Sequence, residues 1–125
     1  MPETSVNAPS DMLTASQALM RWSKRLIDTA PLTQQQQDDM QLIYDAAHKF
    51  YTLARAEMVI IHRKEDPMKL QKVRHQLRNH VNIVVGFAAI LIKEMPDNLL
   101  LHMAQIRRIN ETGNDLLTFV EEELH

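Results

Sequence analysis

From Leu70 to Leu91 the chain reads LQKVRHQLRNHVNIVVGFAAIL, and this stretch carries the clearest structural signal of the sequence. Its apolar residues recur in steps of three and four, which is the pattern of an α-helix with one buried stripe. At about 100° per residue His75 falls well off this stripe, so we expect its imidazole to face solvent. Asn79, Asn82 and Gly86 follow at helical spacing and share that exposed face. The stripe consists of Leu70, Val73, Leu77, Val81, Val84, Ala88 and Leu91.

Three further helices are predicted, two before this one and one after it. Thr33 and Gln36 form a capping box at the start of a long helix, and the Asp66-Pro67 pair ends that helix. His80 lies near the apolar stripe, so we expect it to be partly buried. The predicted helices cover about 16–28, 34–63, 68–94 and 98–122.

The predicted fold class is all-α. We expect a disordered leader over 1–12, an N-terminal helical region over 13–66 and an antiparallel helical hairpin over 67–125. A lone hairpin cannot easily bury both of its apolar stripes, so we predict a homodimer in which two hairpins form a dimeric four-helix bundle. The additional N-terminal helices would extend it. The alternative is that the first two helices fold over the hairpin within one chain.

Composition excludes several functional classes. A net charge of −2 argues against general nucleic-acid binding, and the absence of cysteine excludes disulfides and thiolate chemistry. No apolar run approaches about 18 residues, so no membrane span is predicted. The start of the chain lacks the features of a signal peptide, so the expected location is cytoplasmic. The histidines show no metal-ligand spacing, and no metal or cofactor is expected in this chain.

The segment around His75 resembles the phosphoacceptor box of the dimerisation and histidine phosphotransfer domain of bacterial sensor histidine kinases. A second segment, Ile106–Leu117, resembles the second helix of that hairpin, and the resemblance covers roughly 68–124. The first match places His75 at the phosphoacceptor, Leu77-Arg78 at the Leu-Arg pair, Asn79 at the Thr/Asn position and Gly86-Phe87 at the Gly-aromatic pair.

Three departures from that family limit what the resemblance implies. Gln76 stands where the family has an acidic residue, and a neutral amide cannot act as a general base. His80 replaces the usual proline, so a helix kink is not expected. The chain has only Gly86 and Gly113, too few for the glycine-rich loops of the family's ATP-binding domain. We therefore expect no ATP-dependent autophosphorylation from this chain alone.

The resemblance implies a role in two-component signalling, with a response-regulator receiver domain as the partner. His75 would accept a phosphoryl group, or Asn79 would help to dephosphorylate the receiver, so the chain would serve a phosphotransferase or phosphatase reaction. The receiver would supply Mg²⁺. The receiver domain would contact Arg74, Gln76, Arg78 and Asn82 of this chain. Positive charge around His75 suits an acidic partner surface. It comes from Arg63, Lys64, Lys69, Lys72, Arg74 and Arg78.

Other interpretations remain open. His75 can be a plain surface histidine or a relic in a non-catalytic module that binds a kinase or regulator, and Gln76 favours this reading. A monomeric histidine phosphotransfer domain also shows a histidine, an apolar residue and a basic residue at this spacing. A fourth possibility is a fragment of a full sensor histidine kinase.

Overall fold

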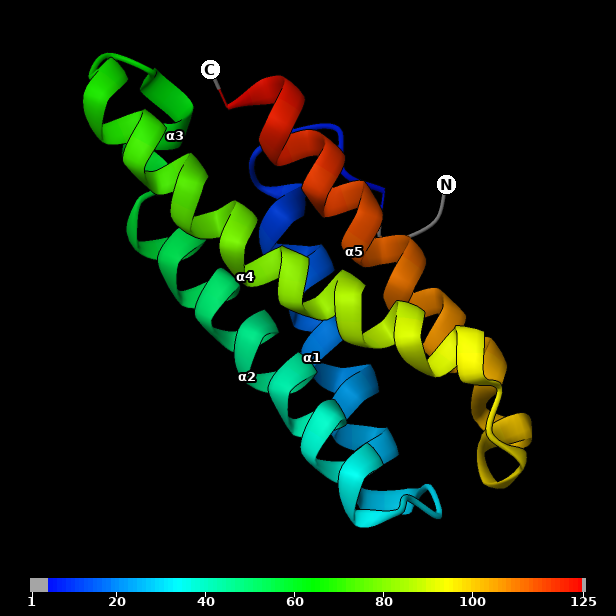
Figure 1. Ribbon diagram of the computed structural model, residues 1–125. Helices are drawn as coiled ribbons and strands as arrows, with labels where there is room; N and C mark the ends of the chain where they lie inside the picture. Colours follow the sequence, from blue (N-terminus) through cyan, green and yellow to red (C-terminus); the bar gives the residue numbers. More distant parts are fainter. Residues whose placement is uncertain (1–4, 125) are drawn as a thin grey trace.

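Four long helices enclose a single hydrophobic core in the computed structural model, which describes residues 5–124 (Figure 1). A short helix α3 and a 3-10 helix η1 lie between the long ones, and no strand occurs in the described part of the chain. The all-α prediction is confirmed. The elements are α1 (Asp11–Thr29), α2 (Gln34–Ala56), α3 (Met58–Arg63), α4 (Pro67–Glu94), η1 (Asp97–His102) and α5 (Met103–Glu123).

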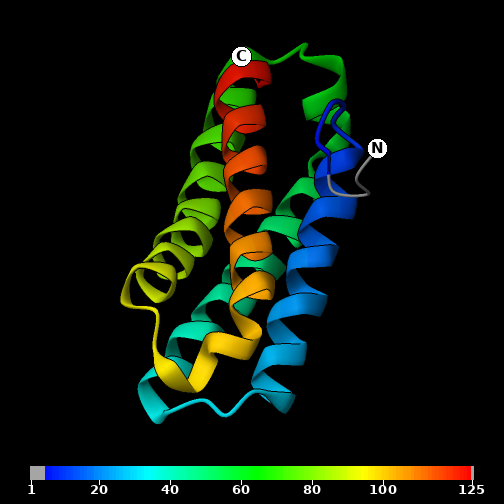
Figure 2. The same cartoon turned by 90° about the vertical axis from the view of Figure 1, so that its right-hand side faces the viewer.

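The long helices run alternately down and up, so that each is antiparallel to the next (Figures 1 and 2). Helix α1 packs on α2, α2 on α4, and α4 on α5, while a smaller contact between α5 and α1 closes the bundle. The described helices include none that is long and apolar enough to cross a membrane.

The apolar stripe of α4 is buried as predicted. Its seven predicted members are the seven buried residues of this helix, and Leu77 is completely inaccessible to solvent. Opposite them lie the large side chains of the other helices. These include Leu19 and Leu26 of α1, Met40, Ile43 and Phe50 of α2, and Ile106, Ile109 and Leu116 of α5.

The α4–α5 hairpin is covered by helices of its own chain, whereas the prediction placed a second copy of the hairpin there. Helices α1 and α2 occupy the position expected for a second copy, so the four-helix bundle forms within one chain. The hairpin's apolar stripes, which two helices alone would leave exposed, are already buried in the single chain at Leu77, Val84, Leu99 and Ile106. The structure thus has the alternative arrangement, with the first two helices folded over the hairpin.

The predicted start of the first helix differs from the observed one. Helix α1 begins at Asp11 rather than near residue 16, and Met12 is fully buried. The Asp11 carboxylate accepts hydrogen bonds from the backbone N–H groups of Asn7 and Ala8, which orders the approach to the helix. Of the predicted leader over 1–12, residues 1–4 lie outside the described residues.

The predicted capping box at the start of α2 is present. The Thr33 hydroxyl accepts from the Gln36 backbone N–H at 3.2 Å, and the Gln36 side chain accepts from the Thr33 backbone N–H at 3.0 Å. The single helix predicted over 34–63 is interrupted at Glu57, after which α3 buries Ile61 against the core.

The corner between α4 and α5 is wound more tightly than predicted. A 3-10 turn replaces the first turn of the α-helix expected from residue 98. The Asn98 amide donates to the Pro31 carbonyl at 2.9 Å and to the Gln36 side chain at 2.7 Å, which ties this corner to the α1–α2 loop. Short 3-10 turns are frequent at the ends of α-helices and in the connections between them.

The two glycines occupy opposite environments. A Cβ atom at Gly113 would lie 3.0 Å from Val85 Cγ2 and 3.3 Å from Val84 Cγ1, so α5 approaches α4 closely at this point. A Cβ atom at Gly86 would meet nothing within 4 Å. The Asn110 amide also donates to the Val85 carbonyl across this contact, at 3.2 Å.

Alanine substitutions at the two glycines should therefore have different effects. We expect Gly86→Ala to raise the free energy of unfolding by about 0.5–1 kcal/mol, the usual gain for an exposed helix interior. Gly113→Ala should fall short of that gain by about 1–2 kcal/mol, because the added methyl crowds the two valines. Urea denaturation of both variants measures the difference. Equal effects would contradict the close approach of the two helices.

Candidate functional site

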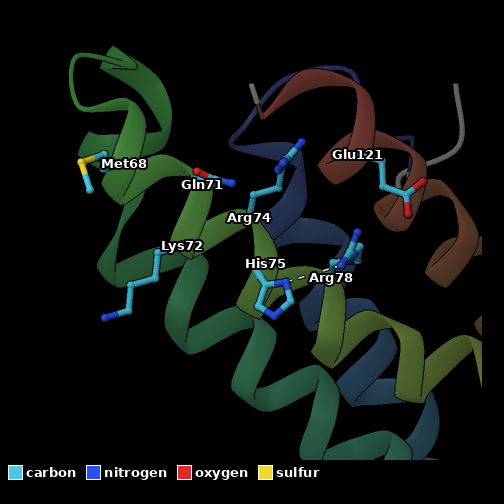
Figure 3. A pocket seen from close by; sticks show the side chains of 7 residues that line it. All are labelled: Met68, Gln71, Lys72, Arg74, His75, Arg78 and Glu121. Carbon is cyan, nitrogen blue, oxygen red and sulfur yellow. Dashed lines mark hydrogen bonds between the residues drawn. The ribbon is translucent and has the colours of Figure 1, made fainter.

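His75 lies on the outer face of α4, exposed as the sequence predicted, at the edge of an open depression of about 460 Å³ (Figure 3). Most of the wall comes from α4, since side chains three and four residues apart stack on one face of a helix. The opposite wall comes from α5. The depression is lined by Met68, Gln71, Lys72, Arg74, His75 and Arg78 of α4 and by Glu121 of α5.

Local hydrogen bonds position the two walls. Pro67 occupies the first turn of α4, and the Asp66 carboxylate caps the helix by accepting the Lys69 backbone N–H at 3.1 Å. The Lys64 ammonium donates to the Glu123 backbone carbonyl at 2.6 Å. This bond holds the last turn of α5 beside the start of α4, so that Glu121 faces the depression.

One hydrogen bond joins two of the predicted site residues. Arg78 Nη2 lies 3.4 Å from His75 Nδ1, and Figure 3 shows the two side chains turned toward each other. A guanidinium carries only donors and stays protonated in proteins. Nδ1 can therefore take part in this contact only as the acceptor, in the neutral tautomer that has its hydrogen on Nε2.

The charge of the depression is mainly positive. Lys72, Arg74 and Arg78 supply three cations, against the single carboxylate of Glu121. Such an excess attracts anions and acidic surfaces, and arginine in particular suits phosphoryl oxygens because its donors form a planar fork.

The structure brings together only some of the predicted site residues. Arg74, His75 and Arg78 line one depression, whereas Gln76 faces α3 and lines a separate one with Glu57 and Lys69 among others. Asn79 and Asn82 are exposed farther along α4. They lie beyond the residues that line the depression.

Sequence reasoning missed Glu121. The run of three glutamates at the end of α5 has the pattern of a solvated helix terminus, and no local signal connects it with His75. Only the antiparallel packing of α5 on α4 brings this carboxylate to the basic wall.

His80 is partly buried, as predicted, on the side of α4 that faces α2. Burial lowers the pKa of His80 below the 6.5 of ordinary imidazole, and the nearby Lys49 ammonium lowers it further. Both effects disfavour the imidazolium form. The neutral imidazole of His80 is therefore favoured in the folded protein.

The lowered pKa of His80 makes stability depend on pH. Because the unfolded chain takes up this proton at higher pH than the folded protein does, stability falls as the pH drops below the unfolded value of 6.5. We expect the parent to lose more stability than His80→Gln between about pH 7.5 and about pH 5.5 in thermal unfolding scans. His62→Gln, at an exposed position, is the control. Parallel pH profiles for the parent and His80→Gln would contradict the prediction.

Within residues 5–124, no three histidine, aspartate or glutamate side chains are placed to hold one metal ion.

The chain was compared with protein-family models, with curated proteins and with solved structures. None of the three comparisons finds a match.

Proposed function

We propose that this chain is a histidine phosphotransfer protein of two-component signalling, which exchanges a phosphoryl group between His75 and an aspartate of a receiver domain. The observation that carries the proposal is the placement of His75. Its imidazole is exposed on the outer face of a long helix in a four-helix bundle and lies in a depression rich in arginine. The resemblance of the surrounding segment points to the same chemistry. Such a partner implies a cytoplasmic location.

The proposed reaction needs little covalent machinery from this chain. A ring nitrogen of His75 attacks the phosphorus of the receiver's aspartyl phosphate, a nitrogen–phosphorus bond forms, and the bond from phosphorus to the aspartate oxygen breaks. The electron pair returns to the aspartate as a carboxylate. The receiver holds Mg²⁺, and Arg78 supplies positive charge to the phosphoryl oxygens.

The neutral Gln76 is compatible with this reaction. A carboxylate is a good leaving group, so transfer from an acyl phosphate does not need the acidic residue that assists attack on ATP in the resembling family. Incubation of this chain alone with labelled ATP and Mg²⁺ should accordingly leave His75 unlabelled.

The proposal is tested with receiver domains encoded in the same genome. Each receiver is charged with radiolabelled acetyl phosphate, separated from the donor and mixed with this protein. Label should move to the protein from at least one receiver in a form that is labile in acid and stable in alkali, as a phosphoramidate is. Retention of the label by every charged receiver would refute the proposal.

We further propose that the protein acts as a monomer, because its apolar stripes are covered within one chain. Sedimentation across a dilution series should give the mass of a single chain. A dimer that persists on dilution would restore the homodimer of the sequence analysis, with contacts outside the core.

A non-catalytic interaction module is the second candidate, and Gln76 is the observation that favours it. In that case the same face of α4 binds a kinase or regulator without chemistry. Binding of an unphosphorylated partner would then be the only activity, and transfer of label would be absent.

A further inference from the structure

A second group of exposed cations lies along α1, on the side of the bundle remote from His75. Helices α2 and α5 each pack on both α1 and α4, so that α1 and α4 lie diagonally across the bundle, and Figure 2 shows α5 between them. Three of the cations belong to α1 and one to the neighbouring α5. We call this group the α1 basic surface, and it consists of Arg21, Lys24, Arg25 and Arg108.

Two open depressions flank the cations of α1, and each has an aromatic residue in its wall. The depression on one side has a volume of about 490 Å³ and is lined in part by Trp22. The other has a volume of about 440 Å³ and is lined in part by Met20 and by Tyr44 of α2. Arg21 and Lys24 line both. A peptide segment laid along α1 can therefore place side chains on either side of a basic ridge.

Two of the arginines keep donors for a partner. The Arg108 guanidinium carbon lies 4.4 Å from the centre of the Trp22 ring, a cation–π contact that restrains the guanidinium and leaves its edge donors open. Within residues 5–124 the guanidinium groups of Arg25 and Arg108 have no hydrogen bond or ion pair. Lys24 differs, because its ammonium pairs with the Asp28 carboxylate at 3.1 Å.

The charge of this surface has the opposite sign to that of the whole chain. Its four cations and the single carboxylate of Asp28 give a net charge of +3, whereas the chain has a net charge of −2. The exposed charges next to Arg108 on α5 are Arg107 and Glu111, which offset each other. The rest of the molecule is therefore net acidic.

We propose that the α1 basic surface binds an acidic segment of a protein partner. Arginine forks match carboxylates, and the depressions beside them suit the apolar side chains of such a segment. A nucleic acid fits less well, because the net acidic remainder of the molecule repels a long polyanion. This inference does not depend on the proposed function.

The experiment uses a defined peptide as the probe. The probe alternates glutamate and leucine and has no tryptophan, and a matched peptide has glutamine in place of glutamate. Trp22 is the one tryptophan of the chain, so its fluorescence reports on this surface. We expect the acidic peptide to change the emission saturably and the glutamine peptide to leave it unchanged. The affinity should fall when sodium chloride is raised from about 0.05 M to about 0.5 M.

NMR shows where the peptide binds. In ¹H–¹⁵N spectra the backbone signals of α1 and of Arg108 should shift on titration, and those of α4 around His75 should not. This distinguishes the α1 basic surface from the basic depression at His75, which is also able to attract an anion.

Three variants test the charges. Arg25→Glu should weaken binding of the acidic peptide about tenfold, because it removes one attraction and adds one repulsion of about threefold each. Arg55→Glu makes the same change at an exposed arginine of α2 outside both depressions, and it should leave the affinity unchanged. Asp28→Asn should strengthen binding about threefold, a gain that a damaged fold does not produce. Thermal unfolding confirms that the variants fold.

Several results would overturn the proposal. These are equal binding of the acidic and glutamine peptides, or of neither, and shifts centred on α4. Equal effects of Arg25→Glu and Arg55→Glu would also overturn it, because they would show that only net charge matters. Tighter binding of single-stranded oligothymidylate than of the acidic peptide would assign the surface to nucleic acid instead.

Discussion

Leu77→Asp is expected to unfold the protein. Leu77 is completely buried in the centre of the bundle, and its removal alone should cost about 2–5 kcal/mol. A carboxylate left at this position has no partner, which adds the cost of burying an unpaired charge. Because a whole domain is stable by only about 5–15 kcal/mol, the sum approaches the total. Circular dichroism should show loss of the cooperative thermal transition at neutral pH.

Gln76→Asp is the matched control for this prediction. It introduces the same side chain one position earlier on α4, where the residue is exposed. Its effect on the free energy of unfolding should stay within about 0.5 kcal/mol. A Leu77→Asp variant that melts cooperatively near the melting temperature of the parent would show that the apolar stripe of α4 is not buried in the core.

His75→Ala is expected to abolish phosphoryl transfer and leave the fold intact. The side chain is exposed and contributes no core packing, so the change in stability should be below about 0.5 kcal/mol. Transfer should nevertheless fall to background, because the nucleophile is gone. The measurement is the label on the protein after incubation with a charged receiver, and His62→Ala, which removes an exposed histidine of α3, should transfer like the parent.

Asn79→Ala separates transfer from dephosphorylation. Asn79 lies one helical turn after His75 but outside the depression, so we expect transfer to persist while any dephosphorylation of the receiver slows. If His75→Ala matches the parent in every partner assay while Leu77→Asp is inactive, the bundle is an interaction scaffold. The phosphotransfer proposal would then be wrong.

Much of the local structure was predictable because its causes are local. The capping box of Thr33 and Gln36 and the buried stripe of α4 follow from side chains within a few residues of each other, and both are observed. The helix interruption at Glu57 and the 3-10 turn at η1 were missed. Each accompanies a tertiary contact, the burial of Ile61 in one case and the bonds of Asn98 in the other.

The candidate site was predictable only in part. Helical spacing placed His75 on the exposed face and Arg78 one turn away, but it did not determine which ring nitrogen the guanidinium contacts. That depends on side-chain rotamers, which the spacing leaves open. Gln76 was grouped with these residues, yet it lies on the side of α4 that faces Glu57 and Ile60, where it lines a different depression.

The sequence by itself determined that this chain forms helices with one apolar stripe each and that His75 stands outside the stripe of α4. It did not determine what covers those stripes, because an apolar stripe requires burial but does not specify a partner surface. Only the tertiary structure decided that α1 and α2 cover the hairpin within one chain. The same packing brings Glu121 of α5 across from His75, a pairing between distant segments that no local pattern encodes.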